Sequence, residues 1–294
     1  MSTTSIPSLE EFLALPAEQV VQVAPATVVF AVGGTRRSAA LAGVAPHSDA
    51  YAHWLRVRMV TCIELFFRLG VRHLFTTAIR PGQVAEVGPY RERLMQWNDW
   101  GLAGPEALAD YARLGWRVRL LGTESIPELR PAAERLLVST PDLSPHTLWW
   151  YVVPDRDLPW RWILEAAQRT HARTREEAIR ALYGEDIPLA SLYLGFGKLM
   201  MAPDILPPLL ADEIQCYWPQ RPGYELDEQM LRRVFYDYAY LRSTWRANRG
   251  DRYEDLGWQR AAWRTDAVIG VGRRLGDFWY PAAFPEPPIS SHGE

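Results

Sequence analysis

Short apolar runs of strand length alternate along this chain with helical stretches of ten or more residues, and this alternation constrains the fold more than any other feature. The apolar runs cover residues 26–32, 71–78, 116–121, 147–153 and 190–195, and a strand-like segment lies at 215–218. The expected helices lie at 49–69, 90–114 with a break at 101–105, 127–140, 160–172, 174–183 and 227–246. Apolar strands that lack a polar alternation are covered on both faces, which is typical of parallel sheets joined through helices.

These elements predict a single α/β domain with a mostly parallel central sheet of five or six strands, flanked by helices. We expect the domain to span residues 1–294, with 1–20 and 284–294 as peripheral termini. In open sheets of this kind, ligands bind at the carboxyl ends of the strands. Side chains that directly follow a strand are therefore the first candidates for a functional site.

Composition removes several functional classes. With 294 residues, 48% of them hydrophobic and 23% charged, the chain is expected to be globular and not disordered. Its net charge of −3 provides no basic field, so no nucleic-acid partner is expected. No stretch reaches the roughly 18 apolar residues of a membrane span, and the acidic amino terminus does not match a signal peptide. Cys62 and Cys216 lie among apolar neighbours, which favours free thiols and a cytoplasmic protein.

The segment Gly33-Gly34-Thr35-Arg36-Arg37 directly follows the first expected strand. Glycines let backbone N–H groups approach a ligand closely, and a threonine hydroxyl with two guanidinium groups adds donors to the same small volume. This combination suits a diphosphate. The alternative is a tight turn followed by two solvated arginines, and the spacing matches neither the P-loop nor the dinucleotide-binding glycine pattern.

Two further glycine-rich elements repeat this pattern. Gly195-Phe196-Gly197-Lys198 follows another apolar strand and carries the only lysine of the chain, which favours Lys198 as a second anion contact. Near the carboxyl end, the element Val268-Ile269-Gly270-Val271-Gly272 precedes two arginines. Each element alone is a weak signal, but the three together favour a phosphate-rich ligand.

In their order and spacing, these motifs resemble the tuberculosinol/isotuberculosinol synthases, which are diterpene synthases with a cis-prenyltransferase fold. The resemblance covers most of the chain, although the segment from about 80 to 170 matches poorly. Besides the glycine-rich elements, it is carried by Glu11-Phe12-Leu13-Ala14-Leu15-Pro16, Tyr183-Gly184-Glu185, the helix at 231–242 and Phe278-Trp279. The chain shares Trp218-Pro219 with the chain-elongating cis-prenyltransferases, but their R-x-G-E-x-R signature is replaced by the second glycine-rich element.

The resemblance implies an enzyme that ionises a prenyl or cyclised prenyl diphosphate, releases diphosphate and gives a terpene alcohol or olefin. It places Arg36 and Arg37 on the diphosphate, beside Gly34 and Thr35, and it implies a homodimer. Tyr51 corresponds to a pocket tyrosine of the family near the reacting carbon, where it would orient a water or accept a proton. Guanidinium groups would stabilise the departing diphosphate, while aromatic faces would stabilise the cation and exclude water.

Gly33 departs from the family pattern, which has an aspartate at this position that serves magnesium and the diphosphate. Its loss removes a metal ligand and changes the local charge by one unit, so a dependence on Mg2+ is in question and no metal ligand is assigned. Three outcomes stay open: another carboxylate substitutes, the arginines alone support ionisation, or catalysis is lost. Asp49, two residues before Tyr51, is the nearest candidate catalytic carboxylate, although an acidic residue also suits the first turn of a helix.

Two alternatives to a terpene synthase stay open. One is a non-catalytic subunit that keeps the fold and partners an active prenyltransferase, which the missing carboxylate at Gly33 favours. The other is prenyl transfer to an acceptor other than isopentenyl diphosphate, which nothing in the sequence separates from ionisation and quenching. Arg233, in the last expected helix, is a further candidate for diphosphate binding, or it faces solvent.

Overall fold

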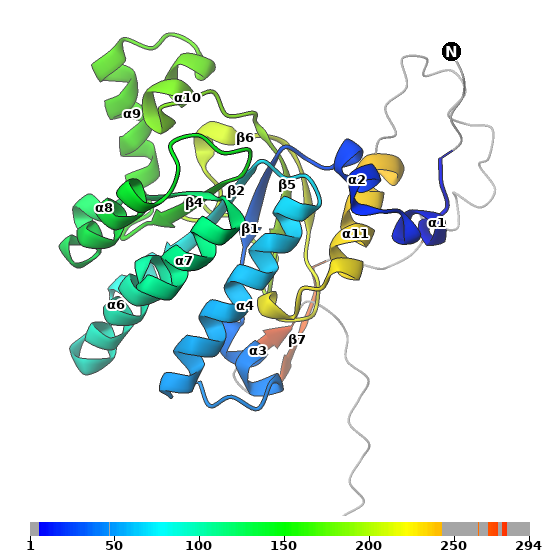
Figure 1. Cartoon of the computed structure of the whole chain (residues 1–294), viewed down its shortest axis with the longest axis horizontal. Helices are drawn as coiled ribbons and strands as arrows, with labels where there is room; N and C mark the ends of the chain where they lie inside the picture. Colours follow the sequence, from blue (N-terminus) through cyan, green and yellow to red (C-terminus); the bar gives the residue numbers. More distant parts are fainter. Residues whose placement is uncertain (1–5, 47, 243–263, 265–269, 276–277, 281–294) are drawn as a thin grey trace, which may run out of the picture.

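A six-stranded parallel sheet forms the centre of the molecule (Figure 1). The computed structural model describes residues 6–46, 48–242, 264, 270–275 and 278–280. The strands are β1 (Thr27–Ala31), β2 (His73–Ile79), β3 (Arg117–Leu121), β4 (Thr147–Val152), β5 (Ala190–Gly195) and β6 (Ala211–Tyr217). They follow the order β3-β4-β2-β1-β5-β6, and each neighbouring pair is parallel. The predicted fold class is confirmed, and β6 begins four residues before the expected strand.

The position of β1 decides where a ligand can bind. This strand pairs with β2 on one side and with β5 on the other, so β2 to β4 extend the sheet in one direction from β1, and β5 and β6 extend it in the other. Open parallel sheets form their ligand crevice at such a reversal, beyond the carboxyl ends of the strands. The residues after β1 and β5 therefore face a common space.

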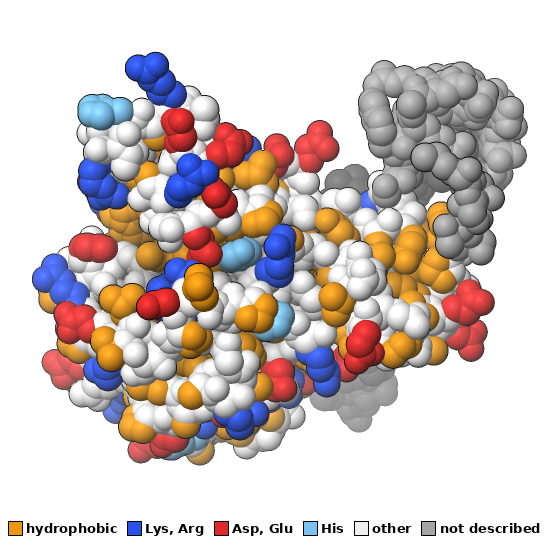
Figure 2. Space-filling view, turned by 45° about the horizontal axis from the view of Figure 1, so that its top comes forward, with side chains coloured by type: hydrophobic (Ala, Val, Ile, Leu, Met, Phe, Trp, Pro, Cys, Tyr) orange, Lys and Arg blue, Asp and Glu red, His pale blue; other side chains and the backbone are white. Residues whose placement is uncertain are grey.

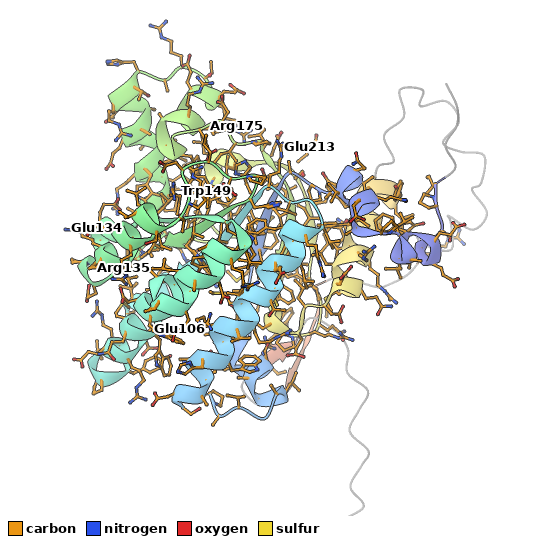
Figure 3. All side chains as sticks on the ribbon, viewed as in Figure 1. Glu106, Glu134, Arg135, Trp149, Arg175 and Glu213 are labelled. Carbon is orange, nitrogen blue, oxygen red and sulfur yellow. The ribbon has the colours of Figure 1, made fainter. Side chains whose placement is uncertain are left out.

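Helices cover both faces of the sheet. The larger layer contains α4 (Asp49–Arg68), α6 (Gly88–Ala103), α7 (Pro105–Leu114) and α8 (Arg130–Ser139), and the smaller one contains α9 (Leu158–Thr170) and α10 (Arg175–Tyr183). The expected helix break lies at Gly104-Pro105, where the proline starts α7. Arg135 of α8, labelled in Figure 3, donates to the carbonyl oxygen of Ala103 and to Asp99, and so fastens α8 to the end of α6.

Side chains of each strand alternate between these two layers. Trp149 lies in the smaller core with Val29 and Phe75, whereas Trp150 lies in the larger core with Phe30. Both tryptophans are buried. Successive residues of a strand point to opposite faces, so the continuous apolar runs fill two cores at once.

Shorter elements complete the chain. They are α1 (Leu9–Ala14), α2 (Ala17–Val20), α3 (Thr35–Leu41), α5 (Pro81–Val84), α11 (Glu228–Tyr236), a π-helical turn at Asp237–Leu241, 3-10 turns at Val21–Val23, Thr123–Ser125, Pro127–Leu129, Pro208–Leu210 and Gly223–Glu225, and an antiparallel pair formed by β7 (Arg273–Leu275) and β8 (Phe278–Tyr280). The last expected helix thus changes from α-helical to π-helical geometry at Asp237, and its residues 243–246 lie outside the described ranges.

The helix α1 near the amino terminus packs against α11 at the edge of the molecule (Figure 1). Phe12 of α1 is fully buried, and its ring lies 5.5 Å from that of Tyr236 on α11. Arg232 of α11 donates a hydrogen bond to the carbonyl oxygen of Leu15 at 2.7 Å. These contacts fasten α1 and the segment after it to α11, and the expected terminus 284–294 lies outside the described part of the chain.

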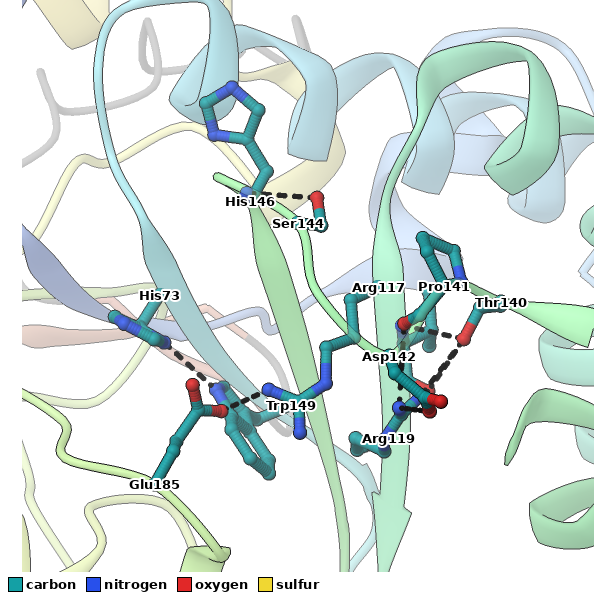
Figure 4. Close-up of polar contacts among 11 residues, drawn as sticks. His73, Arg117, Arg119, Thr140, Pro141, Asp142, Ser144, His146, Trp149 and Glu185 are labelled. Atoms are coloured by element: carbon teal, nitrogen blue, oxygen red, sulfur yellow. Dashed lines mark hydrogen bonds and ion pairs between the residues drawn. The ribbon is translucent and has the colours of Figure 1, made fainter. Parts of the chain in front are cut away.

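A polar network fastens the amino edge of the sheet, opposite the carboxyl ends of the strands (Figure 4). Trp149 donates its indole N–H to Nδ1 of His73 at 3.3 Å, and Arg117 pairs with Glu185 above the ring of Trp149. Burial lowers the pKa of His73 from 6.5 to about 4, and the charges of Arg72 and Arg117 add to this effect. The imidazole is therefore neutral, as its role as acceptor requires.

The surface carries both signs of charge. In Figure 2, acidic and basic side chains are interspersed over the visible face, with no broad region of one sign. Across the described residues, no helix combines the length and the apolar character that a membrane crossing needs.

Candidate active site

The carboxyl edge of the sheet opens into a cavity of about 1170 Å³. The three glycine-rich segments of the sequence meet at its wall, with Gly34, Thr35, Arg36, Arg37, Gly197, Lys198, Gly270 and Arg274 among the lining residues. They come from positions more than 70 residues apart. The pairing of β1 with β5 brings the first two segments together, and the third leads into β7 of the separate two-stranded pair. Residues 268 and 269 of the third segment lie outside the described residues.

Gly34 forms the turn between β1 and α3. Its φ of 73° lies in the left-handed region that glycine adopts without strain. A Cβ at this position would lie 2.6 Å from Nη2 of Arg37, so the missing side chain also leaves room for that guanidinium group. The guanidinium of Arg37 thus lies directly against the turn.

Arg36 contacts α6 through Tyr90. Its Nη2 donates a hydrogen bond to the hydroxyl of Tyr90, and its Cζ lies 5.6 Å from the centre of that ring. Sequence reasoning did not single out Tyr90, because nothing in the local pattern indicates that the start of α6 lies beside α3. The contact leaves Arg36 exposed but oriented at the rim of the cavity.

Tyr51 is joined to the cavity wall through Thr35. Its hydroxyl lies 2.9 Å from Oγ1 of Thr35, and its ring packs edge-on against Trp97. Burial raises the pKa of the Tyr51 phenol, while the hydrogen bond to Thr35 and the charge of Arg36 act in the opposite direction. The phenol is therefore protonated at neutral pH and serves as a donor or acceptor of a hydrogen bond and not as a base.

Asp49 and Arg233 do not join this group. Asp49 is exposed in the first turn of α4, and Arg233 is exposed on α11. Neither lines the cavity. The structure therefore brings together six of the eight residues singled out from the sequence: five at the wall, and Tyr51 one hydrogen bond behind it.

A side chamber of about 250 Å³ adjoins the cavity and shares Arg37, Gly197 and Lys198 with it. Its own walls come from the ends of four strands and from the segment after β5, with Ala31, Thr77, Arg80, Tyr193, Phe196, Ile205 and Trp218. The described walls of both spaces carry basic side chains and no aspartate or glutamate. An anion is the ligand that such walls favour.

Comparison with known proteins supports an enzyme of terpenoid chemistry. The chain is 46% identical over 276 residues to (+)-kolavelool synthase of Herpetosiphon aurantiacus, an alignment that covers 94% of this chain and 96% of that enzyme. The chain belongs to this family of terpene synthases. It is also 24% identical over 300 residues to tuberculosinyl adenosine transferase of Mycobacterium tuberculosis, covering 93% and 98% of the two chains. No protein-family model matches the chain.

Solved structures show the same fold. Lavandulyl diphosphate synthase from Lavandula x intermedia matches with a TM-score of 0.58 and 14% identity over 74% of this chain and 97% of that one. A probable undecaprenyl diphosphate synthase from Campylobacter jejuni matches with a TM-score of 0.53 and 14% identity over 73% and 95%. The resemblance inferred from the motifs is confirmed: this is a terpene synthase of the cis-prenyltransferase fold. The enzymatic interpretation is confirmed with it, and the non-catalytic subunit loses its support.

Within this terpene synthase family, the described site does not fit a magnesium ion held by protein carboxylates. Mg2+ is usually bound through one or two carboxylates together with substrate phosphates. A Cβ at Gly33 would lie 2.7 Å from the carbonyl oxygen of Phe196, so the backbone occupies the place where an aspartate side chain would begin. The described residues also contain no cluster of three His, Cys, Asp or Glu side chains that suits a metal.

Few tryptophans lie at the described walls, although the sequence contains 13 of them. Trp279 lines the main cavity, and Trp218 lines the side chamber. Trp116, Trp149 and Trp150 are buried in the two cores instead. These three tryptophans therefore serve packing.

Proposed function

We propose that this enzyme ionises a prenyl or cyclised prenyl diphosphate at the main cavity and that water ends the reaction, giving a terpene alcohol. The observation that carries the proposal is the convergence of Arg36, Arg37 and Lys198 on one cavity whose described wall has no carboxylate. Its product class follows the 46% identical relative, which is a (+)-kolavelool synthase.

The chemistry asked of these residues is stabilisation of a leaving group. The C–O bond breaks, its electron pair leaves with the diphosphate, and an allylic cation remains. Guanidinium and ammonium donors that strengthen their contacts as charge develops on the diphosphate lower this barrier. Water then adds to the cation through an oxygen lone pair and passes a proton to the released diphosphate, which yields the alcohol. Tyr51 holds the hydroxyl of Thr35 at the wall and, as a neutral phenol, is our candidate for orienting that water.

Turnover by the purified protein tests the proposal. Geranyl, farnesyl, geranylgeranyl and labdane-type diphosphates are supplied with and without Mg2+, and released diphosphate is measured. In ¹⁸O-labelled water, an alcohol formed by quenching carries the label. No diphosphate release from any of these substrates would contradict the proposal.

The arginine pair provides the matched test of residue roles. Arg36→Ala and Arg37→Ala each remove a charged hydrogen-bond donor, so we expect diphosphate binding to weaken by about 1.5–3 kcal/mol, with a larger effect on kcat if the contact tightens in the transition state. Arg180→Ala, which removes an exposed arginine paired with Asp186, is the control. Unchanged kinetics in both cavity variants would reject the diphosphate assignment.

Prenyl transfer is the second candidate, because the 24% identical relative is a tuberculosinyl adenosine transferase. Adding adenosine to the same reactions distinguishes the two: a prenylated nucleoside in place of the alcohol supports transfer. The homodimer and the cytoplasmic location stay predictions, which sedimentation of the purified protein and fractionation of its native cells test.

A further inference from the structure

Asp204 is a buried carboxylate beside the side chamber. It is 1% exposed, and its Oδ2 accepts a hydrogen bond from Nε of Arg80 at 2.8 Å. Within the described part of the chain, its Oδ1 has no hydrogen-bond partner. Burying a carboxylate costs several kcal/mol unless it is paired and hydrogen-bonded, so the contact to Arg80 is the main compensation for this charge. Such an incompletely satisfied buried group calls for an explanation.

The carboxylate is fixed in place by its backbone. Thr77 of β2 donates its hydroxyl to the carbonyl oxygen of Asp204 at 3.0 Å, and Arg80 follows the end of the same strand. Because β2 anchors both partners, the ion pair holds the guanidinium group of Arg80 in one orientation. Nε is used for this contact, and the Nη nitrogens of Arg80 have no partner among the described residues.

The free edge of Arg80 belongs to the wall of the side chamber. That wall also holds Arg37 and Lys198, and the buried indole N–H of Trp218, another lining residue, has no partner among the described residues. The polar side chains at this end of the chamber thus supply donors and cationic groups. A phosphate group, which is an acceptor on every side, is the ligand class that matches them.

We propose that Asp204 is a positioning residue that holds Arg80 by its Nε, so that the Nη edge binds the diphosphate where it extends from the main cavity into the side chamber. The inference rests on the proposed function for its substrate. It assigns Arg80 as a further diphosphate-binding residue. Asp204 contacts no substrate and acts through Arg80.

The direction in which Asp204→Asn changes the affinity for diphosphate tests this inference. Inorganic diphosphate is the probe, and its Kd is measured by calorimetry on the whole protein, alongside kcat and KM. Asp204→Asn makes the chamber more positive, so a carboxylate that merely repels the ligand would give tighter binding when it is removed. A positioning role predicts the opposite, a Kd severalfold higher, because Arg80 is released from its orientation.

Coupling between the two residues is the second readout. Arg80→Gln is expected to raise the Kd about tenfold, the factor that corresponds to one charge-assisted hydrogen bond. Adding Asp204→Asn to Arg80→Gln should weaken binding no further, since the positioned group is already gone. Asp186→Asn, at an exposed ion pair with Arg180, is the matched control and should leave the Kd unchanged.

The outcomes separate this inference from the proposed function. Unchanged or tighter binding in Asp204→Asn overturns the positioning role, and so does a wild-type protein that does not bind inorganic diphosphate. Diphosphate binding without turnover of any prenyl diphosphate contradicts the proposed function and leaves the anion site standing. If Asp204→Asn does not fold, Arg80→Lys replaces it as the test. This variant keeps the positive charge but lacks the planar set of guanidinium donors, and an unchanged Kd for diphosphate would overturn the inference.

Discussion

Gly33 is enclosed by backbone from two other segments of the chain. Its carbonyl oxygen accepts a hydrogen bond from the N–H of Gly223 at 2.8 Å, and a Cβ would meet the carbonyl oxygen of Phe196 at 2.7 Å. A backbone carbonyl cannot swing aside as a flexible side chain can. The surrounding backbone thus leaves room for a glycine at position 33 and not for an aspartate side chain.

Restoring the carboxylate is therefore expected to fail. Gly33→Asp should lower the free energy of unfolding by about 1–3 kcal/mol, the usual cost of overpacking, and should not create a magnesium-dependent activity. Chemical denaturation and turnover with added Mg2+ or chelator measure the two effects. Gly33→Ala carries the same Cβ without the charge and should be destabilised to a similar extent. A Gly33→Asp variant that outperforms Gly33→Ala only when Mg2+ is present would show that the site accommodates a metal ligand.

Tyr51 contributes through its hydroxyl in the protonated form. We expect Tyr51→Phe to lower kcat by up to about tenfold, since it removes the hydrogen bond to Thr35 that places this hydroxyl at the wall. Thr35→Val should give a similar loss. Burial raises the pKa of Tyr51 above its usual 10, so turnover should show no tyrosine ionisation below that pH. A rate that rises with a midpoint near pH 8 in the wild type, but not in Tyr51→Phe, would show that the phenolate is the active form.

At the level of elements, the amino edge of the sheet is expected to govern acid stability. The pKa of His73 is about 4 in the folded protein and 6.5 in the unfolded chain, so only the unfolded chain takes up this proton between the two values. The free energy of unfolding should therefore fall by up to about 3 kcal/mol as the pH drops from 6.5 to 4. Urea titrations at several pH values measure this slope.

His73→Gln supplies the control for the acid slope. A glutamine still offers an acceptor to the indole of Trp149 but does not titrate. The variant should lose most of the pH dependence between 6.5 and 4, and kcat should stay unchanged because the substitution lies at the edge opposite the cavity. An equally steep slope in this variant would assign the acid sensitivity to other groups.

The inner strands β1, β4 and β5 were predictable because each is a continuous apolar run, whereas β6 carries polar residues at its start and was predicted too short. The elements at the cavity were predictable only in part. The sequence predicted a turn at Gly33-Gly34 but no helix directly after it. In the structure, the short helix α3 begins at Thr35. Arg80, Tyr90 and Asp204 carried no local signal. Their partners lie 54 to 124 residues away, and only the sheet topology brings them together. Arg233 was a candidate as a cation in the first turns of the last expected helix, which either reaches the ligand or faces solvent. It is exposed, and the helix packs against α1.

Across the whole molecule, the groups that bind the ligand and the groups that set alkaline stability are expected to lie in different places. The carboxyl edge holds the basic side chains of the cavity, and the two cores between sheet and helices hold buried phenols. Tyr151 and Tyr183 share a hydrogen bond of 2.6 Å in the smaller core, and burial raises the pKa of both well above 10. Burial has the same effect on Tyr111 and Tyr224 in the larger core.

Alkaline unfolding should follow from these phenols. A group whose pKa is raised in the folded state stabilises the fold fully below its unfolded pKa and loses that contribution as the pH rises further. Stability should thus be flat from about pH 7 to 9 and fall steeply above 10, where the unfolded chain ionises its tyrosines and the folded protein does not. Tyr183→Phe should start about 1–3 kcal/mol less stable, because Tyr151 loses its partner, yet show a shallower decline. Denaturation curves at pH 8 and 10.5 give both numbers, and an equal decline in the variant would place the alkaline sensitivity outside the smaller core.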